Sequence, residues 1–244
     1  MTDNILFLLV VFLSNIVQCI TGFAGTVLAM PFSVLLVGMD VAKPILNLLG
    51  LAASFYIVIK FRRDVNKKEL LRIVCWSMPG MIGGFFQRSL LSSAGTVLLK
   101  LLGGIVILFA VYNFAIFLSK KEFKSMPSAV GAGLLVLGGT VHGVFVCGGP
   151  LLVSYASVKL KGTNEFRATL SSVWIILNGV MFCTDLYNGC FFVQNVLLLS
   201  GISLAVLAGA LVLGNIIAKR LNKSAFLVLT YILMLISGIS LFLK

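Results

Sequence analysis

The two stretches that decide the fold read Gln18-Cys19-Ile20-Thr21-Gly22-Phe23-Ala24-Gly25-Thr26 and His142-Gly143-Val144-Phe145-Val146-Cys147-Gly148-Gly149-Pro150. The first separates the apolar runs 5–20 and 27–38, and the second separates 128–142 and 150–158. Glycine permits the backbone conformations that a break in a helix requires. Non-helical backbone is tolerated within a membrane only where it is buried in protein or lines a wet cavity. We therefore expect two broken helices that meet inside the protein.

The composition places the whole chain in a membrane. Hydrophobic residues make up 60% of the 244 positions and charged residues only 11%, whereas soluble domains are about half apolar and about a quarter charged. Six further apolar runs are long enough to cross a bilayer core of about 30 Å as helices; they cover 44–60, 70–87, 96–118, 168–184, 193–218 and 225–243. We predict one all-α integral membrane domain over 1–244.

The positions of the basic residues indicate how each broken pair crosses. The formal net charge is +12, but the Lys and Arg residues lie in short clusters between apolar runs, as the positive-inside rule requires. This pattern makes the lipid bilayer the partner and argues against nucleic acid. If each pair crosses once, the two sides carry similar numbers of basic residues. If each pair is a re-entrant hairpin, one side keeps only Lys43, Arg88, Lys100 and Lys244, and the other side carries most of the basic residues. Because the positive-inside rule predicts such an excess on the cytoplasmic side, the charges favour the hairpin arrangement.

The hairpin arrangement makes the two halves inverted. Each half, about 4–122 and about 126–244, is then a hairpin followed by three crossings, so the second half enters the membrane upside down. Both termini are expected on the extracytoplasmic side of the inner (plasma) membrane. The halves match weakly but collinearly: Lys43-Pro44-Ile45-Leu46 aligns with Arg167-Ala168-Thr169-Leu170, and 24–28 with 147–151. Inverted repeats with broken helices are a recurring plan of secondary transporters.

The helices that restart after the breaks predict an anion site. A helix N-terminus presents free N–H groups and a partial positive charge, so two of them can bind an anion without a buried cation. His142, the one histidine, is interpreted either as a packing residue or as a substrate contact or proton carrier. Asn178 is a further polar residue that faces this region. The candidate substrate-binding residues are Gln18, Thr21, Gly22, Gly25, Thr26, Asn47, His142, Cys147, Gly148, Gly149, Ser171 and Ser172.

Residues outside the breaks receive structural interpretations. We expect Asp185 to lie at the interface, at the outer end of its span. Glycines elsewhere are expected to allow close packing of helices, as small residues do in membrane proteins. These packing glycines are Gly80, Gly83, Gly84, Gly103, Gly104, Gly131, Gly133, Gly209 and Gly214.

The motifs resemble those of the TauE/SafE sulfite exporter family. The first break contains Q-x-x-x-G-F-x-G from Gln18 to Gly25, and the second contains G-x-x-x-x-G-G-P-L-L-V from Gly143 to Val153. The resemblance covers nearly the whole chain and implies transport of sulfite, sulfoacetate or other organosulfonates. It places the family's glycine signature on Gly22, Gly25 and Thr26, and on Cys147, Gly148 and Gly149. Departures at Ala24, Thr26 and Cys147 leave the substrate open.

The leading hypothesis is a secondary transporter that exports small sulfur-containing anions by alternating access. The alternatives are an anion channel, a thiosulfate uptake carrier and an intramembrane enzyme. A single histidine excludes H-E-x-x-H zinc chemistry, and the scarcity of acids within the spans argues against a carboxylate dyad. His142 with Ser203 is the remaining hydrolase pair. We expect no enzyme, catalytic residue, metal or cofactor; the transport direction and a coupling proton or ion stay open.

Overall fold

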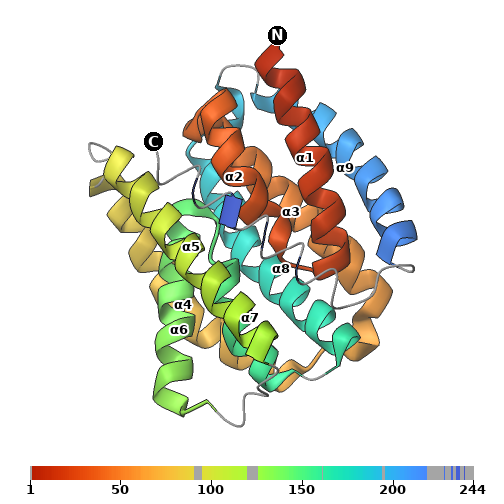
Figure 1. Ribbon diagram of the computed structural model, residues 1–244. Coiled ribbons are helices and arrows are strands. Elements are labelled where there is room, and N and C mark those ends of the chain that lie inside the picture. The colour runs from red at the N-terminus through yellow and green to blue at the C-terminus, as the bar shows by residue number, and fades with distance from the viewer. Residues whose placement is uncertain are drawn as a thin grey trace.

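The computed structural model of the chain is helical throughout its described part (Figure 1). It describes residues 2–90, 95–119, 126–160, 162–193 and 196–218, with Val228, Ile232, Leu235, Ile236 and Ile239. The expectation of an all-α protein is confirmed. The expected crossing over 225–243 lies outside the described residues, apart from those five isolated positions.

Nine α-helices follow one another along the described ranges. The first break separates α1 (Thr2–Thr21) from α2 (Ala24–Val37), and the second separates α6 (Ser128–Phe145) from α7 (Gly149–Lys159). Of these four helices, α1 and α6 are long and apolar enough to cross a membrane, as are α3, α8 and α9. The other helices are α3 (Met39–Phe61), α4 (Lys67–Leu90), α5 (Gly95–Ser119), α8 (Thr163–Tyr187) and α9 (Val196–Ala218).

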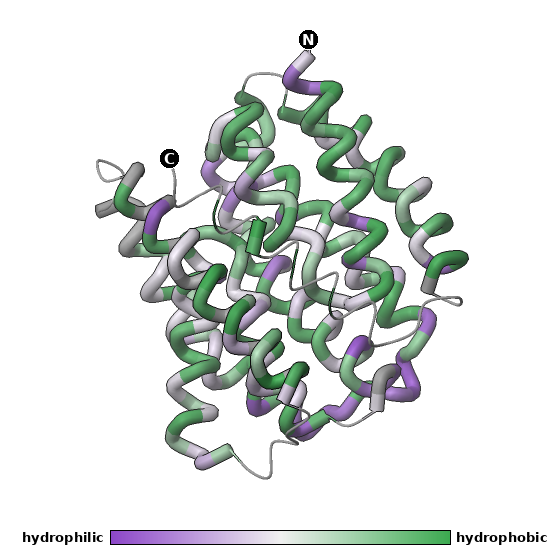
Figure 2. The backbone as a smooth tube through the Cα atoms, viewed as in Figure 1, coloured by the Kyte–Doolittle hydropathy of each residue, from purple (hydrophilic) through white to green (hydrophobic). Residues whose placement is uncertain are grey.

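The outer surface of the helices is apolar, as a bilayer requires. Phe86 on α4 and Leu108 on α5 are each 65% exposed, and an exposed apolar surface of this kind needs lipid or another protein to cover it. Figure 2 shows hydrophilic residues gathered at the end where α3 leads into α4 and α7 leads into α8. The described helices therefore form a multi-pass membrane protein.

Helices α3 and α8 lie antiparallel at the centre of the fold. Near the start of α3, the Lys43 ammonium lies 3.3 Å from the Asp185 carboxylate near the end of α8. At the opposite end, the backbone N–H of Asn66 donates to the Thr169 hydroxyl at 2.9 Å. Asp185 lies near the end of α8, as expected, and it is 2% exposed because it packs against the fully buried Lys43.

Glycines bring α4 against α6 at backbone contact. A Cβ on Gly139 would lie 1.9 Å from the Ser77 carbonyl oxygen, and one on Gly84 would lie 2.3 Å from the carbonyl oxygen of Thr140. The same arrangement joins α9 to α1 at Gly214, where a Cβ would lie 2.7 Å from Cys19 Cβ. The expected packing role is thus confirmed for Gly84 and Gly214, and Gly139 has the same role. The expectation is wrong for Gly83 and Gly133, which face open space.

The two helices on either side of each break fold back on one another. In the second pair, a Cβ on Gly138 would meet Leu152 at 2.2 Å, and one on Gly131 would meet the Tyr155 ring at 2.9 Å. In the first pair, Gly25 packs on Gln18 in the same way, and Figure 1 shows α2 turning back beside α1. Each pair therefore brings its break to a tip inside the protein.

Candidate functional site

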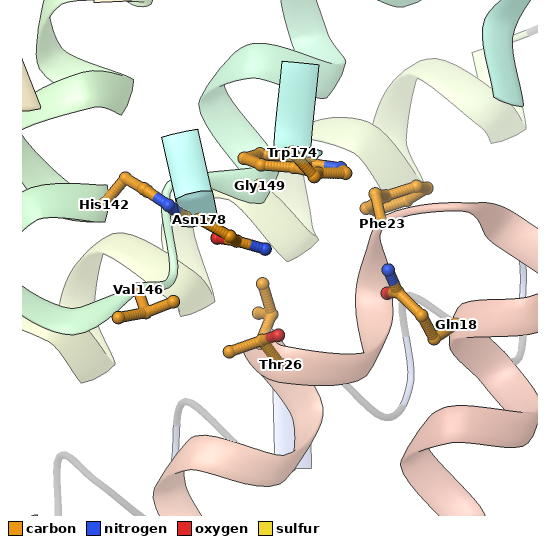
Figure 3. A pocket seen from close by; sticks show the side chains of 9 residues that line it. Gln18, Phe23, Thr26, His142, Val146, Gly149, Trp174 and Asn178 are labelled. Carbon is orange, nitrogen blue, oxygen red and sulfur yellow. The ribbon is translucent and has the colours of Figure 1, made fainter. Parts of the chain in front are cut away.

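A small, narrow cavity lies where the two breaks approach each other. Figure 3 shows one wall built from α1 and α2 and the opposite wall from α6 and α7, with α8 contributing the remaining side chains. The lining residues are Gln18, Phe23, Thr26, Val27, His142, Val146, Gly149, Trp174 and Asn178.

The first break is shaped by a glycine and capped by a threonine. Gly22 has φ of +83°, in the left-handed region that residues with a Cβ rarely adopt. The Thr21 hydroxyl accepts hydrogen bonds from the backbone N–H groups of Phe23 and Ala24, each at 3.2 Å. These contacts satisfy the first N–H groups of α2, so the threonine supports the break and does not line the cavity.

Gln18 connects the first break to the cavity. Its side-chain oxygen accepts a hydrogen bond from the Gly25 backbone N–H at 2.7 Å. An amide carries one acceptor oxygen and one donor NH₂ group, so this bond fixes which end of the amide faces the helix. Gln18 is thereby left to present its NH₂ group to a ligand. The N–H of Gly25, which the sequence suggested as a direct anion contact, is already bonded.

The second break leaves its restarting helix without a side-chain cap. Val146 closes α6 with a left-handed φ of +59°, a conformation that is rare for β-branched residues and concentrated at functional sites. Helix α7 then begins at Gly149, with Pro150 in its first turn and no capping side chain. The positive end of α7 therefore borders the cavity directly, since Gly149 lines it.

Among the residues that the structure describes, three cavity side chains carry buried polar atoms that make no hydrogen bond of good geometry, although His142 and Asn178 lie within reach of each other. These atoms are both ring nitrogens of His142, Nε1 of Trp174 and Oδ1 of Asn178. The rings of His142 and Trp174 lie 5.3 Å apart, and Figure 3 shows His142 and Asn178 pointing toward each other. A buried polar atom without a partner costs about 1–3 kcal/mol. Such atoms gathered around one cavity indicate a ligand site.

The cavity brings together only part of the predicted set. Gln18, Thr26, His142 and Gly149 line it. A second group shapes the breaks: besides Thr21, Gly22 and Gly25, the Cys147 thiol contacts the Thr26 carbonyl oxygen at 3.8 Å, and Gly148 packs against Gly138.

The predicted residues on α3 and α8 lie outside the cavity lining. Asn47 donates to the backbone oxygen of Asn178 at 3.3 Å, and Ser172 bonds to Ala168 within its own helix at 2.9 Å. The Ser171 hydroxyl is buried without a partner. Sequence reasoning missed Trp174, although its spacing from Ser171 and Asn178, three and four residues, puts all three on one helix face.

The chemistry of the lining suits a small anion bound by neutral donors. Apart from His142, no titratable side chain is among the lining residues that the structure describes. Ser203, which the sequence paired with His142 as a hydrolase alternative, lies buried on α9 and is not among those residues. The cavity therefore offers amide, indole and hydroxyl groups and a helix N-terminus, and it presents no carboxylate to repel an anion.

Comparison with known proteins gives one match. The family model described as "Sulfite exporter TauE/SafE" matches residues 7–241. No curated protein and no solved structure shows a match to the chain.

Proposed function

The chain belongs to the TauE/SafE sulfite exporter family, and we propose that it exports small sulfur-containing anions such as sulfite, sulfoacetate or other organosulfonates. The observation that carries this proposal is the set of unpartnered polar atoms around the cavity between the breaks. Trp174 Nε1–H can only donate, and the Gln18 amide presents its NH₂ group. With the N-terminus of α7, these donors suit the three oxygens of a sulfite or sulfonate group.

The remaining lining accommodates the rest of such a substrate. Phe23, Val27 and Val146 are apolar, so a short carbon chain attached to a sulfonate would contact hydrocarbon. Neutral donors hold an anion less tightly than a buried guanidinium would, because they lack the Coulomb attraction between opposite full charges. A carrier benefits from this moderate strength, since it must release the anion on the other side.

Contacts between α3 and α8 support an inverted-repeat architecture. The sequence spacing that matches Lys43 with Arg167 also matches Phe61 with Asp185. Lys43 pairs with Asp185, and the Arg167 guanidinium lies 4.9 Å from the centre of the Phe61 ring. A two-fold axis that lies in the plane of the membrane exchanges these two contacts. The same axis exchanges the close α4–α6 and α1–α9 packing, where the first helix of each half lies against the fourth helix of the other.

The glycine contacts indicate which helices move together during alternating access. Gly84 and Gly139 join α4 to α6, and Gly214 joins α9 to α1. Closely packed helices of this kind shift as one body more easily than they separate. The two rocking units are then α1–α2–α9 and α4–α6–α7, each with helices from both halves, and the cavity lies between them.

Substrate binding is tested by thermal stabilisation of the purified protein. We expect sulfite or a small sulfonate at 100 times its Kd to add about 2.7 kcal/mol, which raises Tm by roughly 5–10 °C. Sulfate, thiosulfate, sulfoacetate, isethionate and taurine complete the series. Trp174→Phe keeps an aromatic side chain and removes the donor, so it should abolish the shift. The matched control is Trp76→Phe, at a half-exposed tryptophan on α4. An equal shift in the Trp174→Phe protein would refute the site.

The inverted topology is tested by cysteine labelling in a variant whose native cysteines are alanine. The loops after α3 and before α8 contact each other: Asn66 donates to the Glu165 carboxylate at 2.8 Å. Cysteines placed at Asp64 and Asn164, both exposed, should react with an impermeant thiol reagent only from the cytoplasmic side. A cysteine at Asn188 should react from the outside. Labelling of positions 64 and 164 from opposite faces would show that each broken pair crosses once.

A further inference from the structure

Two cations share one aromatic ring where α3 ends and α8 begins. The Arg167 guanidinium carbon lies 4.9 Å from the centre of the Phe61 ring, and the Lys60 ammonium lies 5.5 Å from the same centre. The salt bridges among the described residues join Lys43 to Asp185 and Arg72 to Glu69, so neither Arg167 nor Lys60 has a carboxylate within 4.0 Å in that part of the chain. Two positive charges so placed attract an anion.

The opposite end of the same helix pair is built differently. There Lys43 occupies the position that matches Arg167, and Asp185 occupies the position that matches Phe61. The Lys43–Asp185 pair is neutral and buried, with 1% and 3% of the side chains exposed. Where one half has the Asp185 carboxylate, the other half has the Phe61 ring. The end with Asp185 is therefore neutral, and the end with Phe61 keeps positive charge that a ligand can neutralise.

The positions of both cations are fixed by neutral groups. Arg167 donates to the Cys19 carbonyl oxygen near the end of α1, and its Nε is buried without a partner. Lys60 donates to the Asn215 side-chain oxygen at 2.9 Å, and the Asn215 amide donates in turn to Tyr56. Arg167 is half-buried and Lys60 is exposed, so solvent reaches the cluster that these partners hold in place. These cations are held toward the first break.

Packing contacts connect this cluster to the wall of the cavity. Phe166, next to Arg167, packs edge-on against Phe23 with ring centres 6.2 Å apart, and Phe23 lines the cavity. The Arg167 backbone also lies against Gly22, where a Cβ would be 3.4 Å from the Arg167 Cα. The Phe23–Phe166 pair thus joins the segment that carries Arg167 to the cavity wall.

We propose that Arg167 and Lys60 form a second anion-binding position, at the cytoplasmic mouth, which takes up a sulfur oxyanion before it enters the cavity. The inference rests on the proposed export function and adds an entry site to it. The charge asymmetry between the two ends concentrates substrate at the cytoplasmic face, and the neutral Lys43–Asp185 pair offers no comparable trap on the outside.

The experiment measures sulfite transport into inside-out vesicles, which presents the cytoplasmic face to the solution. Arg167→Gln removes a charge-assisted contact and should raise the KM for sulfite about tenfold or more, with turnover within about threefold. Arg167→Lys should recover part of that loss. The matched control is Arg63→Gln, an exposed arginine beside the cluster, which should change KM by less than about twofold.

A second pair of variants leaves Arg167 in place. Phe61→Asp recreates the ion pair of the opposite end and should raise the cytoplasmic KM about tenfold, whereas Phe61→Leu should change it less than about threefold. The KM measured from the outside should stay the same in both. Trp174→Phe should impair transport from either face. A failure of the entry-site proposal can therefore be distinguished from a failure of the cavity proposal. If Phe61→Asp has the wild-type KM on the cytoplasmic side while Trp174→Phe is still impaired, the entry-site proposal is overturned and the cavity proposal stands.

Discussion

Replacement of Asp185 by Ala is expected to destabilise the protein by about 3–5 kcal/mol, the usual cost of removing one partner of a buried ion pair. Lys43 is fully buried and Asp185 is 2% exposed, with 3.3 Å between the ammonium and the carboxylate. The variant removes the charge that neutralises Lys43 inside the membrane-spanning helix pair. For a chain of this size the loss corresponds to a fall in Tm of roughly 10 °C or more in detergent.

The double variant Lys43→Met/Asp185→Leu separates the cost of an uncompensated charge from the value of the pair. Replacing a buried pair by apolar residues of similar volume is often neutral or stabilising, so the double variant should melt within about 3 °C of wild type or above it. Asp64→Ala, at an exposed carboxylate, is the control for loss of an acidic residue. A Tm for Asp185→Ala equal to that of Asp64→Ala would show that the pair does not form.

A single methyl group on Gly139 should have an effect of similar size. The Cβ of Gly139→Ala would lie 1.9 Å from the Ser77 carbonyl oxygen, so α4 and α6 must move apart along their whole contact. Overpacking of a core costs about 1–3 kcal/mol and occasionally more, and a backbone obstacle cannot rotate away as a side chain can. We expect a fall in Tm of roughly 5–10 °C and a smaller yield of monodisperse protein.

Gly133→Ala on the same helix is the matched control. Gly133 faces open space, so the added methyl meets nothing, and the exchange of glycine for alanine in a helix interior gains about 1 kcal/mol. Its Tm should therefore equal or exceed that of wild type. Equal behaviour of the two variants would show that the glycines do not set the distance between α4 and α6.

The sequence was sufficient for the class of protein and for the location of the candidate cavity. Composition indicated a helical membrane protein, and the glycine-rich breaks indicated where helices end and restart. Both breaks border the cavity, with Gln18, Thr26, His142 and Gly149 in its lining. These features are local: apolar length, glycine content and the polar residues beside it are readable from adjacent positions of the chain.

The sequence by itself therefore determined that the chain is a helical membrane protein with two internal breaks, because these properties depend on neighbours along the chain. Only the tertiary structure decided which residues from distant parts of the chain contact one another. It buried Asp185 against Lys43, placed Trp174 over His142, and set both Lys60 and Arg167 against Phe61. The α3–α8 pairing accounts for the ion pair and the two cations, since antiparallel helices bring residues more than a hundred positions apart into contact while their sequence surroundings give no sign of it.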